Sequence, residues 1–238
     1  LQNNKKFNPE KINFYSNNNL NKICELDITK FNSENCKYTT LKRSTLIKLL
    51  KTNLSEQIKT GYNISKIDQQ GKQIKLSFEN DKIEECDYLI ISDGVFSKSK
   101  SLISNDKTKP KYYNKLAIRG KLTKSYENVD NKNISLFLGS DFHQVIYPTN
   151  PHGDLNFIAL MKYQLSADEQ KNYKLFNDNS FIRKILERTP LENKNFIDNL
   201  SDLKIFPVFV NDDFYKIENR KIHLIGDAFF TFPPSFAQ

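Results

Sequence analysis

Two short apolar segments far apart in the sequence end in the same way, and they constrain the fold more than any other feature. Leu89–Gly94 (LIISDG) and His223–Ala228 (HLIGDA) each run from a strand-like stretch into an aspartate beside a glycine. In open α/β sheets, ligands bind at the carboxyl ends of strands, where glycine permits a close approach to the backbone. A carboxylate there is an acceptor suited to sugar or ribityl hydroxyls, whereas it would repel a phosphate. Asp-Gly and Gly-Asp are also ordinary turn dipeptides, so the pattern alone names no ligand.

Length and composition indicate a folded protein. The chain has 238 residues, of which 38% are hydrophobic and 27% charged, so it is too apolar to be disordered. No apolar run reaches the ~20 residues of a membrane helix, and the first residues lack a signal-peptide core. Cys24, Cys36 and Cys86 stand at unrelated spacings, which excludes a disulfide framework and a paired-cysteine motif. We therefore expect a cytoplasmic protein.

The net charge of +8 raises the question of a nucleic-acid partner. The lysines are scattered along the chain, without a basic stripe interleaved with aromatic residues, and no nucleic-acid-binding motif is present. We expect no nucleic-acid partner, because a solvated lysine surface accounts for the charge. A basic binding module without catalysis stays an alternative, and it would bind nucleic acid or anionic lipid in a salt-sensitive way.

Hydrophobic spacing predicts helices and strands in alternation. A helix is expected after Ser44 as its N-cap, because the following apolar residues recur at helical spacing: Leu46, Leu49, Leu50, Leu54 and Ile58. Ile74, Leu76 and Phe78 alternate with polar residues, as in a half-exposed strand. The unbroken run of residues 88–91 predicts a strand buried on both faces. Residues 1–37 are polar and poorly patterned.

The second half of the chain is predicted to contain a run of strands followed by helices. A polar, lysine-rich linker around residues 104–110 leads into several predicted strands, namely LAIRGKL, ISLFLG, FHQVIYP and LNFIALM. Residues 166–200 are predicted to be helical, and the apolar run LKIFPVFV is broken by Pro207. His143, His152 and His223 have no metal-binding spacing, so we expect no metal site. The chain begins at Leu1 and stops at Gln238 after a Pro-Pro loop, and we expect a piece of a longer protein.

Three motifs together resemble the FAD-dependent aromatic-ring hydroxylases, the group with p-hydroxybenzoate, salicylate and ubiquinone-pathway monooxygenases. TTLKRSTLIKLL is similar to the family's Arg-x-x-Leu-x-x-x-Leu helix start, and DYLIISDGVFSKSK to its D-x-x-x-x-x-D-G-x-x-S-x-x-R signature. KIHLIGDAFFTFPPSFAQ resembles the family's L-x-G-D-A-x-H-x-x-x-P-x-x-G-Q segment. The middle segment LGSDFHQVIYPTNPHGDLNFIALM is similar to the family's central sheet.

The resemblance implies an α/β (α+β interleaved) fold: an incomplete Rossmann-like FAD-binding domain with an inserted antiparallel β-sheet substrate domain. Residues 1–104 would form the partial FAD-binding domain, residues 105–205 the substrate domain, and residues 206–238 the return to the FAD-binding domain. The expected cofactor-binding residues are Arg43, Asp93, Gly94, Gly226, Asp227, Ala228, Pro233 and Pro234. The arginine would contact the flavin, Gly226-Asp227 would bind the ribityl chain, and the prolines would border the isoalloxazine ring.

The implied activity is that of a monooxygenase with FAD as cofactor and NAD(P)H as co-substrate. An aromatic or quinone-precursor ring would be hydroxylated by O2 through a flavin hydroperoxide. Substrate contacts are expected from the sheet in residues 115–162, with Arg119, His143, Gln144 and Tyr147 as candidates, although the inward-facing parity cannot be derived from the sequence. No Ser/His/Asp triad is needed for this chemistry, and none is present. Greasy ring substrates leave peripheral contact with the inner face of a membrane open.

The sequence also departs from the family pattern. Lys100 replaces the usual Arg, Phe230 the usual His, and Ala237 the Gly before Gln. No two of the seven glycines are close enough to form GxGxxG, so the helix N-terminus that would hold a pyrophosphate is missing. We therefore expect residues 1–238 alone to bind FAD poorly and to be inactive. A reductase or halogenase of the same fold, or an inactive relative, stays an alternative; oxidation of NADPH stimulated by a phenol, with oxygen incorporation from O2, would favour hydroxylation.

Overall fold

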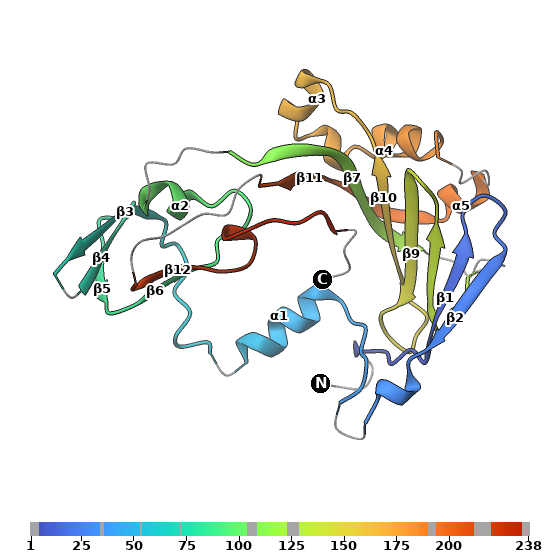
Figure 1. The fold of residues 1–238 in the computed structure, drawn as a ribbon, viewed down its shortest axis with the longest axis horizontal. Coiled ribbons are helices and arrows are strands. Elements are labelled where there is room, and N and C mark those ends of the chain that lie inside the picture. The colour runs from blue at the N-terminus through green and yellow to red at the C-terminus, as the bar shows by residue number, and fades with distance from the viewer. Residues whose placement is uncertain are drawn as a thin grey trace. The chain divides into compact units, whose positions relative to one another are not determined.

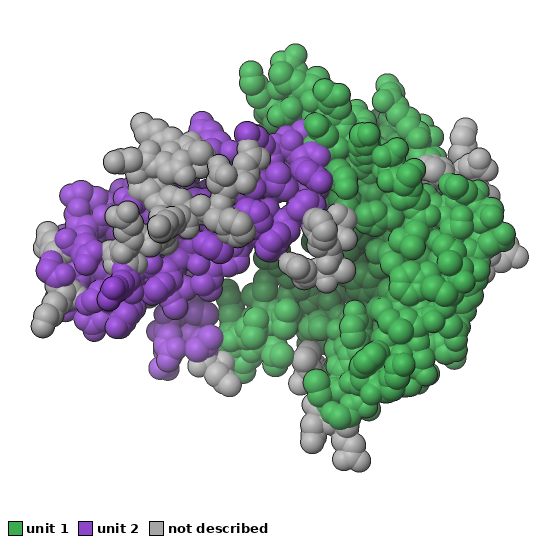
Figure 2. Space-filling model, in the orientation of Figure 1, with its two compact units in different colours: residues 1–53, 114–207 green, residues 54–113, 208–238 purple. Residues whose placement is uncertain are grey.

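The computed structural model describes residues 5–33, 36–52, 54–71, 73–103, 109–122, 129–189, 194–211 and 220–234. It divides the chain into two compact units (Figure 2). Unit 1 contains residues 1–53 and 114–207, and unit 2 contains residues 54–113 and 208–238. Within the described residues, no helix is both long enough and apolar enough to cross a membrane.

A seven-stranded sheet forms the framework of unit 1 (Figure 1). Its strand order is β11-β7-β10-β9-β8-β1-β2. The strand bounds are β1 Lys11–Ser16, β2 Lys22–Asp27, β7 Lys111–Leu122, β8 Ile134–Leu138, β9 Phe142–Pro148, β10 Leu155–Lys162 and β11 Leu200–Val210. β1 lies parallel to β8, whereas the β1–β2, β8–β9, β9–β10 and β10–β7 pairs are antiparallel. The boundaries between the units fall inside β7 and β11.

The helical elements of unit 1 are η2 Thr29–Phe31, α1 Arg43–Lys51, α3 Ala167–Lys171, η3 Leu175–Asn177, α4 Asn179–Leu186 and α5 Lys194–Asp198. Of these, α4 and α5, which follow β10 in the chain, lie against one face of the sheet. The Asp178 side chain caps α4 by accepting hydrogen bonds from the backbone N–H groups of Ser180 and Phe181. α4 buries Ile182, Ile185 and Leu186. Phe196 of α5 packs edge-on against Phe157 of β10, with ring centroids 5.9 Å apart. We call the side of the sheet that carries Phe157 the helix-covered face.

Unit 2 contains two smaller sheets around one core. β3 Ile64–Gln70, β4 Gln73–Phe78 and β5 Ile83–Cys86 form an antiparallel sheet, and β6 Leu89–Ile91 pairs with β12 Ile222–Leu224. The helical elements are α2 Lys98–Ile103 and η4 Gly226–Ala228. The core consists of buried residues from both sheets and η4: Ile74, Leu76, Phe78, Ile91, Ile222, Leu224 and Ala228. This mixture of α and β elements confirms the predicted α/β class.

The N-terminal segment contains order that its polar sequence concealed. Residues expected to be poorly patterned form β1 and β2, and residues 1–53 belong to unit 1 rather than to a unit with residues 54–104. The N-terminal segment belongs to unit 1 because β1 pairs with β8. The residues that pair in these two strands are more than 100 positions apart in the sequence. The compact units group the chain differently from the ranges 1–104, 105–205 and 206–238, whose assignment to cofactor and substrate domains stays a prediction.

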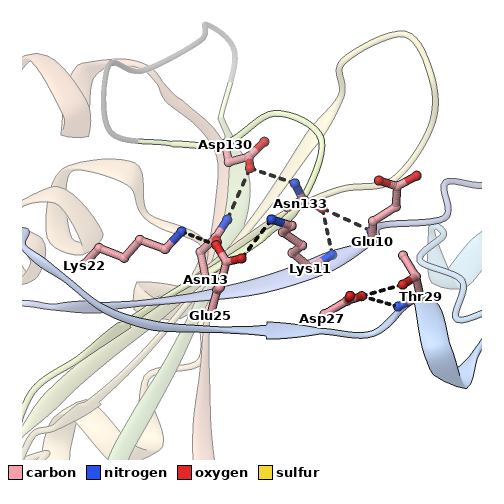
Figure 3. Close-up of polar contacts among 9 residues, drawn as sticks. All are labelled: Glu10, Lys11, Asn13, Lys22, Glu25, Asp27, Thr29, Asp130 and Asn133. Carbon is pink, nitrogen blue, oxygen red and sulfur yellow. Dashed lines mark hydrogen bonds and ion pairs between the residues drawn. The ribbon is translucent and has the colours of Figure 1, made fainter.

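Polar contacts hold this N-terminal hairpin in place (Figure 3). The Asn133 side-chain oxygen accepts hydrogen bonds from the backbone N–H groups of Glu10 and Lys11, at 3.1 and 2.9 Å. Glu25 pairs with Lys11 and Lys22, and hydrogen bonds from these ammonium groups lower the pKa of Glu25 to about 2. These contacts join β1 to β2 and to the turn before β8.

Three local predictions differ from the structure. α1 begins at Arg43 with Lys42 at the N-cap, so Ser44 lies inside the helix, and the helix ends before Leu54. β11 continues through Pro207, which an edge strand tolerates because one side of its backbone needs no ladder hydrogen bond. β6 is not buried on both faces, since Ile90 is 63% exposed. The predicted strands of residues 115–162 and the helices of residues 166–200 are confirmed.

Gly120 offers a direct test of the packing between β7 and β11. A Cβ atom at this position would lie 2.8 Å from Leu203 Cδ2 and 2.9 Å from the Ser201 backbone oxygen. Because the backbone oxygen cannot move away as a flexible side chain can, we expect Gly120→Ala to lower the free energy of unfolding by about 1–3 kcal/mol. Denaturant titration measures this change. Lys121→Ala, which removes only an exposed ion pair with Asp202, is the control and should cost less than about 1 kcal/mol; equal losses would contradict the packing.

Candidate functional site

The two acidic strand ends of unit 2 lie side by side. β6 and β12 are parallel neighbours in which Ile222, His223 and Leu224 pair with Leu89, Ile90 and Ile91. The pairing continues past the strands, because the Ile225 N–H donates to the Ile91 carbonyl oxygen at 3.0 Å. Asp93 follows β6 by two residues and Asp227 follows β12 by three. Both aspartates therefore follow the same carboxyl edge of one parallel pair.

Asp93 also organises the turn that follows β6. Its Oδ2 atom accepts a hydrogen bond of 3.1 Å from the backbone N–H of Ser99, in the first turn of α2. Partial burial raises the pKa of Asp93, but hydrogen bonds from Ser97 and Ser99 outweigh this effect and lower it below the usual value. The serine of the sequence motif thus serves to hold the aspartate. The carboxylate is ionised and remains exposed on one side.

Asp227 is the less constrained acid of the two. It lies in η4, where the backbone N–H groups of Phe229 and Phe230 both donate to the Gly226 carbonyl oxygen, at 2.9 and 3.0 Å. The Thr231 hydroxyl donates to the backbone oxygen of Asp227 at 3.0 Å. The Asp227 carboxylate itself is exposed and has no hydrogen-bond donor among the described residues. Ala228 is buried beneath it.

The glycines beside these acids adopt a backbone conformation that favours glycine. Gly94 has φ +87° and Gly226 has φ +57°, both in the left-handed region. A Cβ atom at either position would meet no atom within 4 Å. The backbone next to both carboxylates is therefore accessible.

This edge fits the hydroxyl groups of a dinucleotide such as FAD. Two carboxylates, from neighbouring parallel strands, present only acceptor atoms, and hydroxyl groups are the donors that they would bind. The edge suits sugar or ribityl hydroxyls better than phosphates, which the same negative charges repel. Pro233 is half-buried and Pro234 exposed in the segment after η4, whereas Ala237 and Gln238 lie outside the described residues.

The predicted flavin-contacting arginine lies in unit 1. Arg43 is the first residue of α1, is exposed, and has no hydrogen bond or ion pair within the described part of the chain. The segment before it is fixed to the sheet, because Lys42 pairs with Asp154 at 2.6 Å and the Thr40 hydroxyl donates to the Pro148 oxygen. Arg43 is thus held at a defined position relative to the end of β9.

The four substrate candidates divide between the two faces of the sheet. Gln144 is 2% exposed and lies on the helix-covered face, like Phe142 and Ile146 on the same strand. Strand alternation places His143 and Tyr147 on the other side. Arg119 joins them there, because Arg119 pairs with Ile158 and Ile158 pairs with Val145. We call this side, with Arg119, His143, Val145, Tyr147 and Ile158, the opposite face.

The opposite face combines an apolar floor with polar groups at its margin. Half-buried Leu136, Val145 and Ile158 are register partners across β8, β9 and β10. The Arg119 guanidinium lies over the Phe206 ring, 5.2 Å from its centroid. The sequence analysis did not single out Leu136, Val145, Ile158 and Phe206. The alternation of side chains along each strand would have assigned them to one face, once the face of a single residue in each strand was known.

Burial shapes the titration of the two β9 candidates. Burial lowers the pKa of His143, and the nearby Lys115 ammonium lowers it further, so the imidazole is neutral at pH 7. Burial raises the pKa of Tyr147, while Arg119 opposes this shift, so the phenol is protonated at pH 7. The three candidates on the opposite face therefore supply one proton acceptor, one hydroxyl and one permanent cation.

Solved structures share this fold. HpxO from Klebsiella pneumoniae, complexed with FAD, matches with a TM-score of 0.79 and 13% identity, covering 97% of this chain and 61% of that protein. Salicylate hydroxylase, in a substrate complex, matches with a TM-score of 0.74 and 14% identity over 97% of this chain and 61% of that one. For 2,6-dihydroxypyridine-3-hydroxylase from Arthrobacter nicotinovorans the values are 0.69 and 13%, over 98% and 64%.

The fold is that of the FAD-dependent aromatic hydroxylases. This confirms the fold predicted from the sequence motifs. The chain spans about three fifths of the length of these proteins. The sequence matches no protein-family model and no curated protein.

The pH dependence of stability tests the contacts of Asp93. Its pKa is lower in the folded chain than the usual 3.8, so its ionised form stabilises the fold above pH 3.8, and this contribution is lost as the pH falls through the folded-state pKa. Asp93→Asn should therefore be less stable than the wild type near pH 7, and the difference should shrink as the pH falls below 3.8 and through the lowered folded-state pKa. Urea titrations across this range measure it. A deficit for Asp93→Asn that stays constant over this range would rule out the proposed contacts.

Proposed function

We propose that the chain is part of an FAD-dependent, NAD(P)H-using monooxygenase that hydroxylates an aromatic or quinone-precursor ring. The observation that carries the proposal is the adjacency of Asp93 and Asp227 at the carboxyl edge of the β6–β12 pair. The shared fold supports it, because HpxO has been solved with FAD. HpxO has also been solved in complex with FAD and uric acid, a small ring compound.

The proposed cofactor residues come from three segments. The Asp227 carboxylate would accept hydrogen bonds from ribityl hydroxyls, with Gly226 and Ala228 shaping the backbone around it. Asp93 and Gly94 would lie beside the same dinucleotide, and Arg43 would contact the flavin. Pro233 and Pro234 would border the isoalloxazine ring. When bound, FAD would supply the redox chemistry, taking electrons from NAD(P)H and delivering an oxygen atom from O2 to the substrate.

The opposite face of the unit 1 sheet is the proposed substrate platform. Val145 and Ile158 would support a planar ring, because apolar surface with few polar groups at its edge is typical of small-molecule sites. The neutral imidazole of His143 could accept a proton from a ring hydroxyl, and the Arg119 charge would stabilise the resulting anion. Tyr147 would donate a hydrogen bond from its protonated hydroxyl. Removing the proton makes the ring richer in electrons, which favours attack on an electrophilic oxygen.

Residues 1–238 alone are proposed to hold FAD weakly. The GxGxxG turn that would bind a pyrophosphate is not among them. Two apolar surfaces agree with this view: α1 buries none of its residues, and Ile90 on β6 is exposed. Parallel sheets are normally covered on both faces, so the exposed face of the β6–β12 pair is expected to be covered in a complete dinucleotide site.

Flavin retention by the whole natural protein tests the proposed role of Asp227. Replacing a carboxylate that accepts hydrogen bonds removes a charge-assisted interaction, so Asp227→Ala should weaken FAD binding about ten- to a hundredfold. The yellow absorbance after gel filtration and the fluorescence of released flavin measure this loss. Asp141→Ala, another exposed aspartate, is the control and should retain the colour. Full retention by Asp227→Ala would exclude the ribityl assignment.

Steady-state kinetics test the substrate platform. Arg119→Gln should lower kcat/KM for an acidic phenol about tenfold or more, because a charge-assisted contact is worth about 1.5–3 kcal/mol. FAD content should remain unchanged, which separates this effect from a loss of cofactor. Arg188→Gln, at an exposed position near α4, is the matched control and should leave the kinetics unaltered. If Arg119→Gln has wild-type kinetics with every ring tested, the opposite face does not bind the substrate.

A further inference from the structure

Three polar side chains lie buried on the helix-covered face of the unit 1 sheet. Asn13 on β1, Ser135 on β8 and Gln144 on β9 are 3%, 0% and 2% exposed. Asn13 and Ser135 are register partners on neighbouring parallel strands. Ser135 pairs with Ile146 and Gln144 pairs with Phe137, so Ser135 and Gln144 are diagonal neighbours on one face. The three side chains therefore form a short polar row across consecutive strands.

One atom of each side chain has no hydrogen-bond partner among the residues that the structure describes. These atoms are Asn13 Oδ1, Ser135 Oγ and Gln144 Oε1, and all three are fully buried. The Asn13 amide is fixed in orientation, because its Nδ2 atom donates to Asp130 Oδ2 at 3.2 Å (Figure 3). A buried polar atom without a partner costs about 1–3 kcal/mol, so three together demand an explanation.

The three atoms cannot satisfy one another. Both amide oxygens accept hydrogen bonds and neither can donate, whereas the serine hydroxyl has a single proton to offer. Direct contact would leave at least one amide oxygen unpaired. A group that donates two hydrogen bonds and accepts one would complete the row, and a water molecule has these capacities.

We propose that Asn13, Ser135 and Gln144 enclose an internal water molecule. The water donates to Asn13 Oδ1 and Gln144 Oε1 and accepts from the Ser135 hydroxyl, which makes the three hydrogen bonds typical of a buried water. It joins β1, β8 and β9 through their side chains, and so adds to the backbone ladders that hold the N-terminal strand in the sheet. Gln144 thereby has a role different from that of its strand neighbours His143 and Tyr147.

A crystal structure of the whole natural protein provides the first test. The expected result is solvent density at about 2.7–3.2 Å from Asn13 Oδ1, Ser135 Oγ and Gln144 Oε1. A Gln144 amide rotated to donate directly to Asn13 or Ser135, with no density between the strands, would overturn the proposal.

A double-mutant cycle provides the second test. Ser135→Ala and Gln144→Met each remove one partner of the water, so the second substitution should cost less once the first has been made. The unfolding equilibrium constant of the double variant should then fall at least about threefold below the value expected from multiplying the two single effects. Effects that multiply within about twofold would show that the side chains share no bridging molecule. Ser140→Ala, at an exposed serine between β8 and β9, is the control and should be neutral alone and in combination.

Discussion

The parallel pairing of β6 with β12 is the contact on which the proposed cofactor site depends. It joins two segments more than 130 positions apart and sets them in a register that brings Asp93 and Asp227 to one edge. The pair is short, and its apolar side chains Ile91, Ile222 and Leu224 fix it on the antiparallel sheet of unit 2. A shift of one residue between the strands would turn these side chains away from the core, so burial enforces the register that aligns the acids.

In the sheet of unit 1, side chains that pack in the core and side chains of the proposed substrate platform alternate along the strands and so lie on opposite faces. Along β9, every second residue packs beneath the helices, while His143, Val145 and Tyr147 face the other way. The arrangement explains how one strand can contribute both to a buried core and to a candidate ligand surface. It also explains why a substitution at Gln144 should affect stability, whereas one at its neighbour His143 should affect the chemistry of the opposite face.

The sequence predicted those parts of the fold whose signals are local. The strands of residues 115–162 and the helices after residue 166 carry clear periodicity, and the acids after residues 91 and 224 follow obvious apolar runs. β1 and β2 escaped prediction because KINFYS and KICELD mix charged and apolar residues and are stabilised by a distant partner, β8. The sequence also could not predict which residues of β9 face the helices. Alternation along a strand shows that neighbouring side chains point to opposite faces, but it does not show which face the helices cover. Ile90 was expected to be buried, and its exposure reflects a sheet of only two strands in the described residues.

A crystal structure of the whole natural protein with FAD would show whether the β6–β12 edge holds the cofactor. We expect the Asp227 carboxylate to lie about 2.5–3.0 Å from a ribityl hydroxyl oxygen, with Asp93 beside the same dinucleotide. A flavin bound away from the β6–β12 edge, with both carboxylates facing solvent, would contradict it.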